Sequence, residues 1–178
     1  MRVKTFAIAS LAASFACAPA FAEEICHERT TQFGKLRHCV TSVRPSEGAI
    51  TFGPEQLDGT GNSAWCSNAN NNNTRQIITL YEEPKATIRT INITNGNATS
   101  DENYRANARV KSALLETDRG YRATITLKDT RAPQIVIIAK ARIGWVRLTI
   151  LDTYPSKQPA TGVCLSEFLV NVEEFANE

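Results

Sequence analysis

The sequence predicts an all-β protein, an antiparallel β-sandwich of the jelly-roll type. Short runs rich in Val, Ile and Thr recur from residue 76 onward, and Pro, Gly or Asp separates them. Apolar and polar residues alternate within these runs, as at 121–128, which is the period of a strand with one wet face. No segment shows a convincing helical period. About eight such strands in one chain favour a sandwich over a helical or mixed fold.

Residues 1–22 have the pattern of a secretory signal peptide. Arg2 and Lys4 precede an apolar centre at 6–15, and residues 20–22 form a small-x-small cleavage site. The apolar run is too short to span a bilayer. We therefore expect cleavage after Ala22, a secreted or periplasmic location, and no transmembrane segment.

The charge of the mature chain is balanced. The signal carries two of the 20 basic residues and none of the 18 acidic ones, so 18 of each sign remain. This balance disfavours nucleic acid or an anionic membrane as a partner. The length suits one domain, and we expect an N-terminal arm at 23–48 followed by the sandwich at 49–178.

Cysteine usage agrees with export. Four cysteines follow the signal, namely Cys26, Cys39, Cys66 and Cys164. An even count in an exported chain predicts two disulfides, with three possible pairings. Zinc binding is the alternative, although the sequence has no C-x-x-C pair, and its only histidines, His27 and His38, each lie beside a cysteine with no second metal-like cluster.

The arm at 23–48 is expected to be a hairpin. Gly34 can turn the chain, and 36–43 has the composition of a strand. A bridge from Cys26 to Cys39 would close a short loop and tie this arm down. The stretch from Arg44 to Gly48 then breaks the chain before a brief strand at 49–52.

The segment at 53–75 is polar and irregular, with one large apolar side chain, Trp65. Trp65 either closes the end of the core or lies open as a stacking surface for a ligand. Further strands are expected at 76–80, 87–93, 109–116, 121–128, 134–139, 145–154 and 164–172.

Residues 92–111 predict a displayed loop, because Asn, Gly, Ser and Asp satisfy their own backbone through Asx-type turns. Within it, Tyr104, Asn107 and Arg109 combine an aromatic face, an amide and a planar cation, a set that can hold a polyhydroxylated ligand. The alternative is structural. Tyr104 would then pack under the loop, Asn107 would cap a turn, and Arg109 would be solvated on a strand.

Six segments of the chain form an ordered set: LDGTGNSAW (57–65), INITNGN (91–97), YRANARVK (104–111), ITLKD (125–129), VRLTILDTYPSKQ (146–158) and CLSEFLV (164–170). Together they resemble the glycan-binding domain first associated with secreted NAD-glycohydrolases, which is a discoidin-like or galactose-binding-like jelly roll. The resemblance covers residues 49–172.

This resemblance implies ligand-binding roles for the residues that match the family pattern, which are Trp65, Tyr104, Asn107, Arg109 and Lys111. It also places the D-G loop at Asp58 beside the closing acidic strand at Glu167. Because Cys66 follows the D-G loop and Cys164 precedes the closing strand, the resemblance implies the disulfides Cys66–Cys164 and Cys26–Cys39. Asp58 and Glu167 are candidates for a structural calcium, although Thr60 stands where a second acid is common. No other cofactor is expected.

The leading hypothesis is an exported, non-catalytic carbohydrate-binding module that recognises a glycan through loops at one end of the sandwich. The alternative is an envelope protein–protein interaction module, either an adhesion factor or an enzyme inhibitor, that presents the same loops. An enzyme has the least support. Both histidines lie on the arm, and the sequence contains no G-x-S-x-G, H-E-x-x-H or phosphate-binding Gly loop.

Overall fold

Strands make up nearly all of the regular structure. The computed structural model describes residues 24–32, 34–60, 63–69, 73–158 and 161–175, so the expected signal peptide lies outside the described residues. The elements in chain order are β1 (Ile25–Thr31), β2 (Gly34–Val40), η1 (Pro54–Leu57), β3 (Trp65–Cys66), β4 (Ile77–Asn95), α1 (Asp101–Ala106), β5 (Ala108–Thr117), β6 (Arg122–Thr126), β7 (Gln134–Tyr154) and β8 (Val163–Phe175). No helix in this part of the chain is long and apolar enough to cross a membrane.

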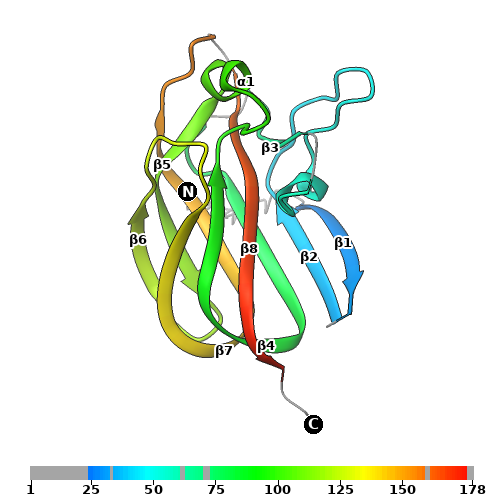
Figure 1. Cartoon of the computed structure of the whole chain (residues 1–178), viewed down its shortest axis with the longest axis vertical. Coiled ribbons are helices and arrows are strands. Elements are labelled where there is room, and N and C mark those ends of the chain that lie inside the picture. The colour runs from blue at the N-terminus through cyan, green and yellow to red at the C-terminus, as the bar shows by residue number, and fades with distance from the viewer. Residues whose placement is uncertain (1–23, 33, 61–62, 70–72, 159–160, 176–178) are drawn as a thin grey trace, which may run out of the picture.

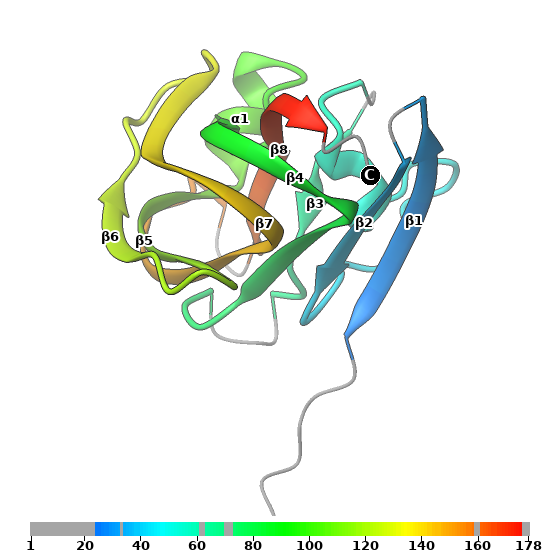
Figure 2. The same cartoon turned by 90° about the horizontal axis from the view of Figure 1, so that it is seen from below.

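The strands form a β-sandwich of two layers, which confirms the predicted fold class (Figure 1). One layer has the order β1-β2-β4-β7-β5-β6, and the other has the order β7-β4-β8-β3. Figure 2 shows the β1–β2 hairpin on one side of β4 and strands β5 to β7 on the other.

Two long strands, β4 and β7, belong to both layers. The sequence predicted each as two separate strands, with a break at Pro84 in β4 and at Gly144 in β7. In the structure both continue, and the register between them shifts after Tyr81 and resumes at Ala86. Pro84 lies inside this shift, where the ladder between β4 and β7 needs no N–H donor. The prediction of a break was therefore wrong, because the irregularity bends the strands without ending them.

The core lies between the layers. Its largest completely buried side chains include Ile78, Leu80, Ile88, Ile91, Ile93, Leu115, Ile143, Leu148 and Phe168. Most of these residues alternate with exposed or half-buried ones along their strands, as the period of a strand with one wet face predicts, whereas Ile78, Thr79 and Leu80 of β4 are all buried.

Both predicted disulfides are confirmed. Cys26 and Cys39 lie opposite each other in the β1–β2 hairpin, and their sulfurs are bonded. Cys66 of β3 and Cys164 of β8 are joined in the same way. The alternative of a zinc site built on these cysteines is wrong, since a disulfide leaves no thiolate to ligate a metal. The arm is part of the sheet, because β2 pairs with β4.

The expected loop at 92–111 is shorter than predicted. β4 runs to Asn95, and β5 begins at Ala108. Between them α1 begins after Ser100, whose Oγ accepts a hydrogen bond of 3.0 Å from the backbone N–H of Asn103. A Ser N-cap with acidic residues in the first turn stabilises a helix start. Six residues are too few to show a helical period in the sequence.

The predicted strand at 49–52 is only an isolated bridge between Glu47 and Ile50. Phe52 does accept a backbone hydrogen bond from Cys66, so this segment reaches the sheet through β3.

Candidate functional site

The end of the sandwich that carries α1 lies opposite the end at which β8 finishes (Figure 1). A polar cavity of about 220 Å³ opens there, between α1 and the segment at 44–52. We call it the amide pocket, and it is defined by the side chains of Arg44, Phe52, Ser63, Asn97, Asn103 and Asn107. The sequence predicted one of these as a binding residue, Asn107.

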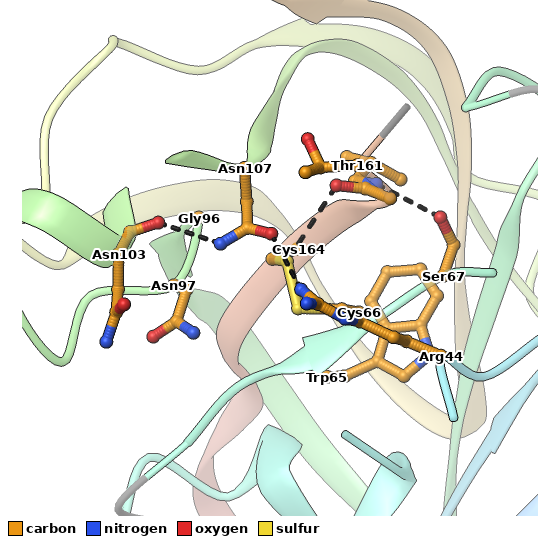
Figure 3. The surroundings of a disulfide bond; sticks show 12 residues. Arg44, Trp65, Cys66, Ser67, Gly96, Asn97, Asn103, Asn107, Thr161 and Cys164 are labelled. Carbon is orange, nitrogen blue, oxygen red and sulfur yellow. Dashed lines mark hydrogen bonds between the residues drawn. A yellow bond between two sulfur atoms is a disulfide. The ribbon is translucent and has the colours of Figure 1, made fainter. Parts of the chain in front are cut away.

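Asn107 fixes one wall of the amide pocket. Its Nδ2 donates to the backbone carbonyl of Asn103 at 2.8 Å, which satisfies a free carbonyl at the end of α1. Its Oδ1 accepts from Nη1 of Arg44 at 3.1 Å (Figure 3). The side chain is 4% exposed, so this amide is held in one orientation.

Arg44 forms the opposite wall. Its guanidinium lies 4.6 Å from the ring centroid of Phe52 and also pairs with the carboxylate of Glu47. Three different contacts therefore hold the cation over the pocket: an amide, an aromatic face and a carboxylate.

The Cys66–Cys164 disulfide lies behind these walls. Figure 3 shows Arg44, Asn97, Asn103 and Asn107 around it. Both cysteines are completely buried and pack with Phe52 and Ala64. The disulfide thus joins β3 to β8 covalently and holds together segments that are far apart in the sequence.

Ser63 has a free hydroxyl. Its residue is 7% exposed, and its buried Oγ has no hydrogen-bond partner in the described part of the chain. Leaving a buried hydroxyl unpaired costs about 1–3 kcal/mol. Ser63 borders the amide pocket and also a second cavity of about 280 Å³, beside Thr99 and Glu167.

Tyr104 and Arg109 are already occupied. Arg109 binds Asp129 through two hydrogen bonds, from Nε at 3.0 Å and from Nη2 at 2.8 Å. Its Nη1 donates to the backbone carbonyls of Asn107 and Pro155. The Tyr104 hydroxyl donates to Asp129 at 2.9 Å, and both burial and that carboxylate raise the pKa of the hydroxyl. This cluster supports α1 from behind.

Two other predicted binding residues lie elsewhere. Trp65 has no exposed surface, and its Nε1 donates to the carbonyl of Ser42 at 3.0 Å. This corrects its assignment as a ligand contact, because a ring with no exposed surface cannot stack on a sugar. Lys111 is half-exposed on β5 and pairs with Asp152 at 2.8 Å, outside the amide pocket.

Asp58 and Glu167 are neighbours, as the resemblance implied, but they do not fit a calcium ion. They form an isolated bridge. Nη1 of Arg29 lies 3.0 Å from Oδ2 of Asp58, and Thr60 donates twice to Oδ1. Although burial alone would raise the pKa of Asp58, the Thr60 hydrogen bonds and the Arg29 charge lower it. A guanidinium on this carboxylate would repel a divalent cation.

The site residues that sequence reasoning missed are Arg44, Ser63, Asn97, Asn103 and Asp129. Ser63, Asn97 and Asp129 do lie inside segments that carried the resemblance, at 57–65, 91–97 and 125–129. Arg44 gave no signal, because its contacts with Phe52 and Asn107 depend on tertiary structure.

Several solved structures share this fold. CpGH89CBM32-5 from Clostridium perfringens, in complex with GalNAc-β-1,3-galactose, is 18% identical, with a TM-score of 0.53 over 76% of this chain and 94% of that one. The family 32 CBM of NanJ from C. perfringens, in complex with galactose, is 13% identical, with a TM-score of 0.56 over 82% and 98%. An F5/8 type C domain from Bacteroides fragilis is 14% identical, with a TM-score of 0.51 over 75% and 89%.

A comparison with curated protein sequences finds no match. The sequence does match the family described as the NAD glycohydrolase translocation F5/8 type C domain, over residues 35–171. This match spans most of the chain and confirms the discoidin-like resemblance. The chain therefore belongs to the NAD glycohydrolase translocation F5/8 type C domain family.

Proposed function

We propose that this protein is an exported, non-catalytic carbohydrate-binding module that holds a saccharide in the amide pocket. The observation that carries the proposal is the free Oγ of Ser63, buried beside side-chain amides in a small polar cavity. Sugar hydroxyls are both donors and acceptors, so they pair best with groups of the same kind, such as hydroxyls and amides. The fold supports this choice, because two similar structures hold galactose or GalNAc-β-1,3-galactose.

Each side chain has a separate role in this proposal. Ser63, Asn97 and Asn103 contact the sugar, and Arg44 closes the pocket over it. Asn107 orients Arg44 through its 3.1 Å hydrogen bond. Tyr104 and Arg109 act as positioning residues, since their polar atoms are bound to Asp129. Lys111 is a charged residue outside the pocket with no direct role.

Calorimetry on the mature protein tests the proposal, with galactose and GalNAc-β-1,3-galactose as probes. Ser63→Ala removes one hydrogen bond and should weaken binding about three- to tenfold. Asn103→Ala removes an exposed amide and should act in the same direction. Thr124→Ala, an exposed change on β6, is the matched control and should leave the affinity unaltered.

Absence of any saccharide binding would contradict the proposal. A protein captured from envelope extract, and retained in excess free sugar and after deglycosylation, would favour the protein–protein module instead. Turnover of a glycoside that a single acidic substitution abolishes would show an enzyme.

A further inference from the structure

A second concave region adjoins the amide pocket. It consists of two cavities of about 420 and 650 Å³ whose walls share Asp101, Arg105 and Lys157. We call these two cavities together the basic hollow. The smaller one also shares Glu102, Ala106 and Gln158 with the amide pocket. A ligand that occupies the amide pocket could therefore extend a substituent into the basic hollow.

Most basic side chains at this end of the molecule have an acidic partner. Arg44 pairs with Glu47. Arg109 pairs with Asp129 at 2.8 Å, and Arg131 pairs with Asp101 at 2.9 Å. These three cations are held by the protein itself, so each is at least partly neutralised before any ligand arrives.

Arg105 and Lys157 differ from them. Both are exposed, and within the described ranges neither side chain has an ion-pair or hydrogen-bond partner. Their backbones are joined, because the N–H of Lys157 donates to the carbonyl of Arg105 at 2.8 Å. Two uncompensated cations are thus kept side by side, one in the last turn of α1 and one in the loop after β7.

One acidic side chain opposes them. Glu102 lines both the amide pocket and the basic hollow and has no ion-pair partner in the described structure, whereas Asp101 is engaged by Arg131. The free charges of the basic hollow are therefore two positive and one negative. Concave walls of one dominant sign concentrate ligands of the opposite sign. A guanidinium fork suits the planar oxygens of a carboxylate and also binds sulfate or phosphate oxygens.

We propose that Arg105 and Lys157 bind a negatively charged substituent of the glycan, so that the ligand is an acidic saccharide bearing a carboxylate or a sulfate ester. This inference rests on the proposed function, because the neutral part of the same glycan occupies the amide pocket. The inference adds to the proposed function the chemical class of the ligand, which is an acidic saccharide.

A series of probes with one sugar ring tests the inference: galactose, galacturonic acid and galactose 6-sulfate, each titrated into the mature protein at low and at physiological salt. One charge-assisted contact should make the anionic probes about tenfold tighter than galactose, and salt should reduce that advantage. The relative affinities of the carboxylate and sulfate probes identify which anionic group is preferred.

Charge-neutralising variants locate the effect. Arg105→Gln and Lys157→Gln should each lower the ratio of the affinities for galacturonic acid and galactose by about threefold or more. Glu102→Gln should raise that ratio, because it removes the opposing charge. Arg89→Gln, an equal charge change at an exposed position on β4, is the matched control and should leave the ratio unaltered.

The outcomes separate the two proposals. Galactose and its anionic relatives could bind equally, and Arg105→Gln and Lys157→Gln could leave the ratios of their affinities unchanged. That result would overturn the inference and leave the proposed function standing. If no probe of either kind binds, the proposed function fails and the inference fails with it. If the anionic probes bind with an absolute affinity that Ser63→Ala does not weaken, the ligand lies outside the amide pocket and both proposals are contradicted.

Discussion

Gly96 shows how closely the backbone packs on the cluster behind the amide pocket. Its φ is +68°, and a Cβ at this position would lie 2.6 Å from Cγ of Arg109 and 2.7 Å from Cδ2 of Tyr104. Both neighbours are buried, and Asp129 holds them, so neither can move away easily. Only glycine meets both requirements without strain.

Gly96→Ala should therefore lower the free energy of unfolding by about 2–4 kcal/mol, because overpacking adds to the cost of a positive φ. Urea denaturation measures this change. Gly120→Ala is the control, since its φ is +78° but nothing lies within 4 Å of its Cβ position. It should cost only about 1 kcal/mol. Equal losses for the two variants would show that the packing around Gly96 is looser than described.

His38 makes the stability of the fold depend on pH. Its ring is 2% exposed, and Nε2 lies 2.8 Å from the carbonyl of Phe168. Burial lowers the pKa of His38 from 6.5 to about 4. The unfolded chain then binds more protons between these two values, so this residue stabilises the fold above pH 6.5 and progressively less as the pH falls to 4.

The expected loss from His38 over that window is up to about 3 kcal/mol, at about 1.4 kcal/mol for each pKa unit. Glu82 acts in the opposite direction, because burial raises its pKa to about 7 and its contribution is lost as the pH rises. Subtracting the unfolding free energy of His38→Gln from that of the wild type at each pH removes the contribution of Glu82, which both proteins share. A difference that does not change between pH 6.5 and 4 would contradict a buried neutral imidazole.

At the scale of single residues, the sequence left the roles of Tyr104, Asn107 and Arg109 open between ligand binding and structure. Tyr104 and Asn107 match the structural alternative, since Tyr104 packs under the loop and Asn107 caps the end of α1. Arg109 matches neither alternative in full. It is buried against Asp129, which lies 20 residues away, and no local pattern reveals a partner at that distance.

At the scale of elements, the strand period identified most of β4 to β8. The prediction from this period failed where strands bend, because Pro84 and Gly144 were interpreted as strand ends, whereas β4 and β7 continue through them. It also missed α1 and β3. β3 has only two residues, and its place in the sheet depends on pairing with β8 and on the Cys66–Cys164 disulfide. The disulfide pairings followed from the resemblance, since spacing alone allowed three.

The two disulfides should have different effects on binding. Replacing Cys26 and Cys39 by Ser opens a loop with a sequence separation of 13 and should cost about 3 kcal/mol of stability. The hairpin contributes none of the walls of the amide pocket. Saccharide affinity should therefore be retained.

Replacing Cys66 and Cys164 by Ser opens a loop with a sequence separation of 98 and should lower the free energy of unfolding by about 4–5 kcal/mol. The same change frees the wall segments of the amide pocket, so affinity should fall sharply in whatever fraction still folds. Calorimetry beside thermal unfolding measures both quantities for each pair. Equal saccharide affinities in the two double variants would show that the Cys66–Cys164 disulfide does not shape the amide pocket.

At the scale of the whole molecule, the sandwich brings distant segments to one end. The walls of the amide pocket come from 44–52, from Ser63 and from 97–107, and the basic hollow adds Lys157. Sequence analysis could predict a binding end from the fold class but could not assemble this set, because its members meet only through long-range pairing. The unpaired hydroxyl of Ser63 and the exposed cations of Arg105 and Lys157 lie where these segments meet.

The most direct test of a saccharide site at this end is a backbone amide chemical-shift titration of the mature protein with galactose. We expect the largest shifts in the residues 44–52, 63 and 97–107, and small shifts in β1 and β6. Shifts concentrated on β1 or β6, or no shifts at saturating galactose and galacturonic acid, would contradict a saccharide site between α1 and the segment at 44–52.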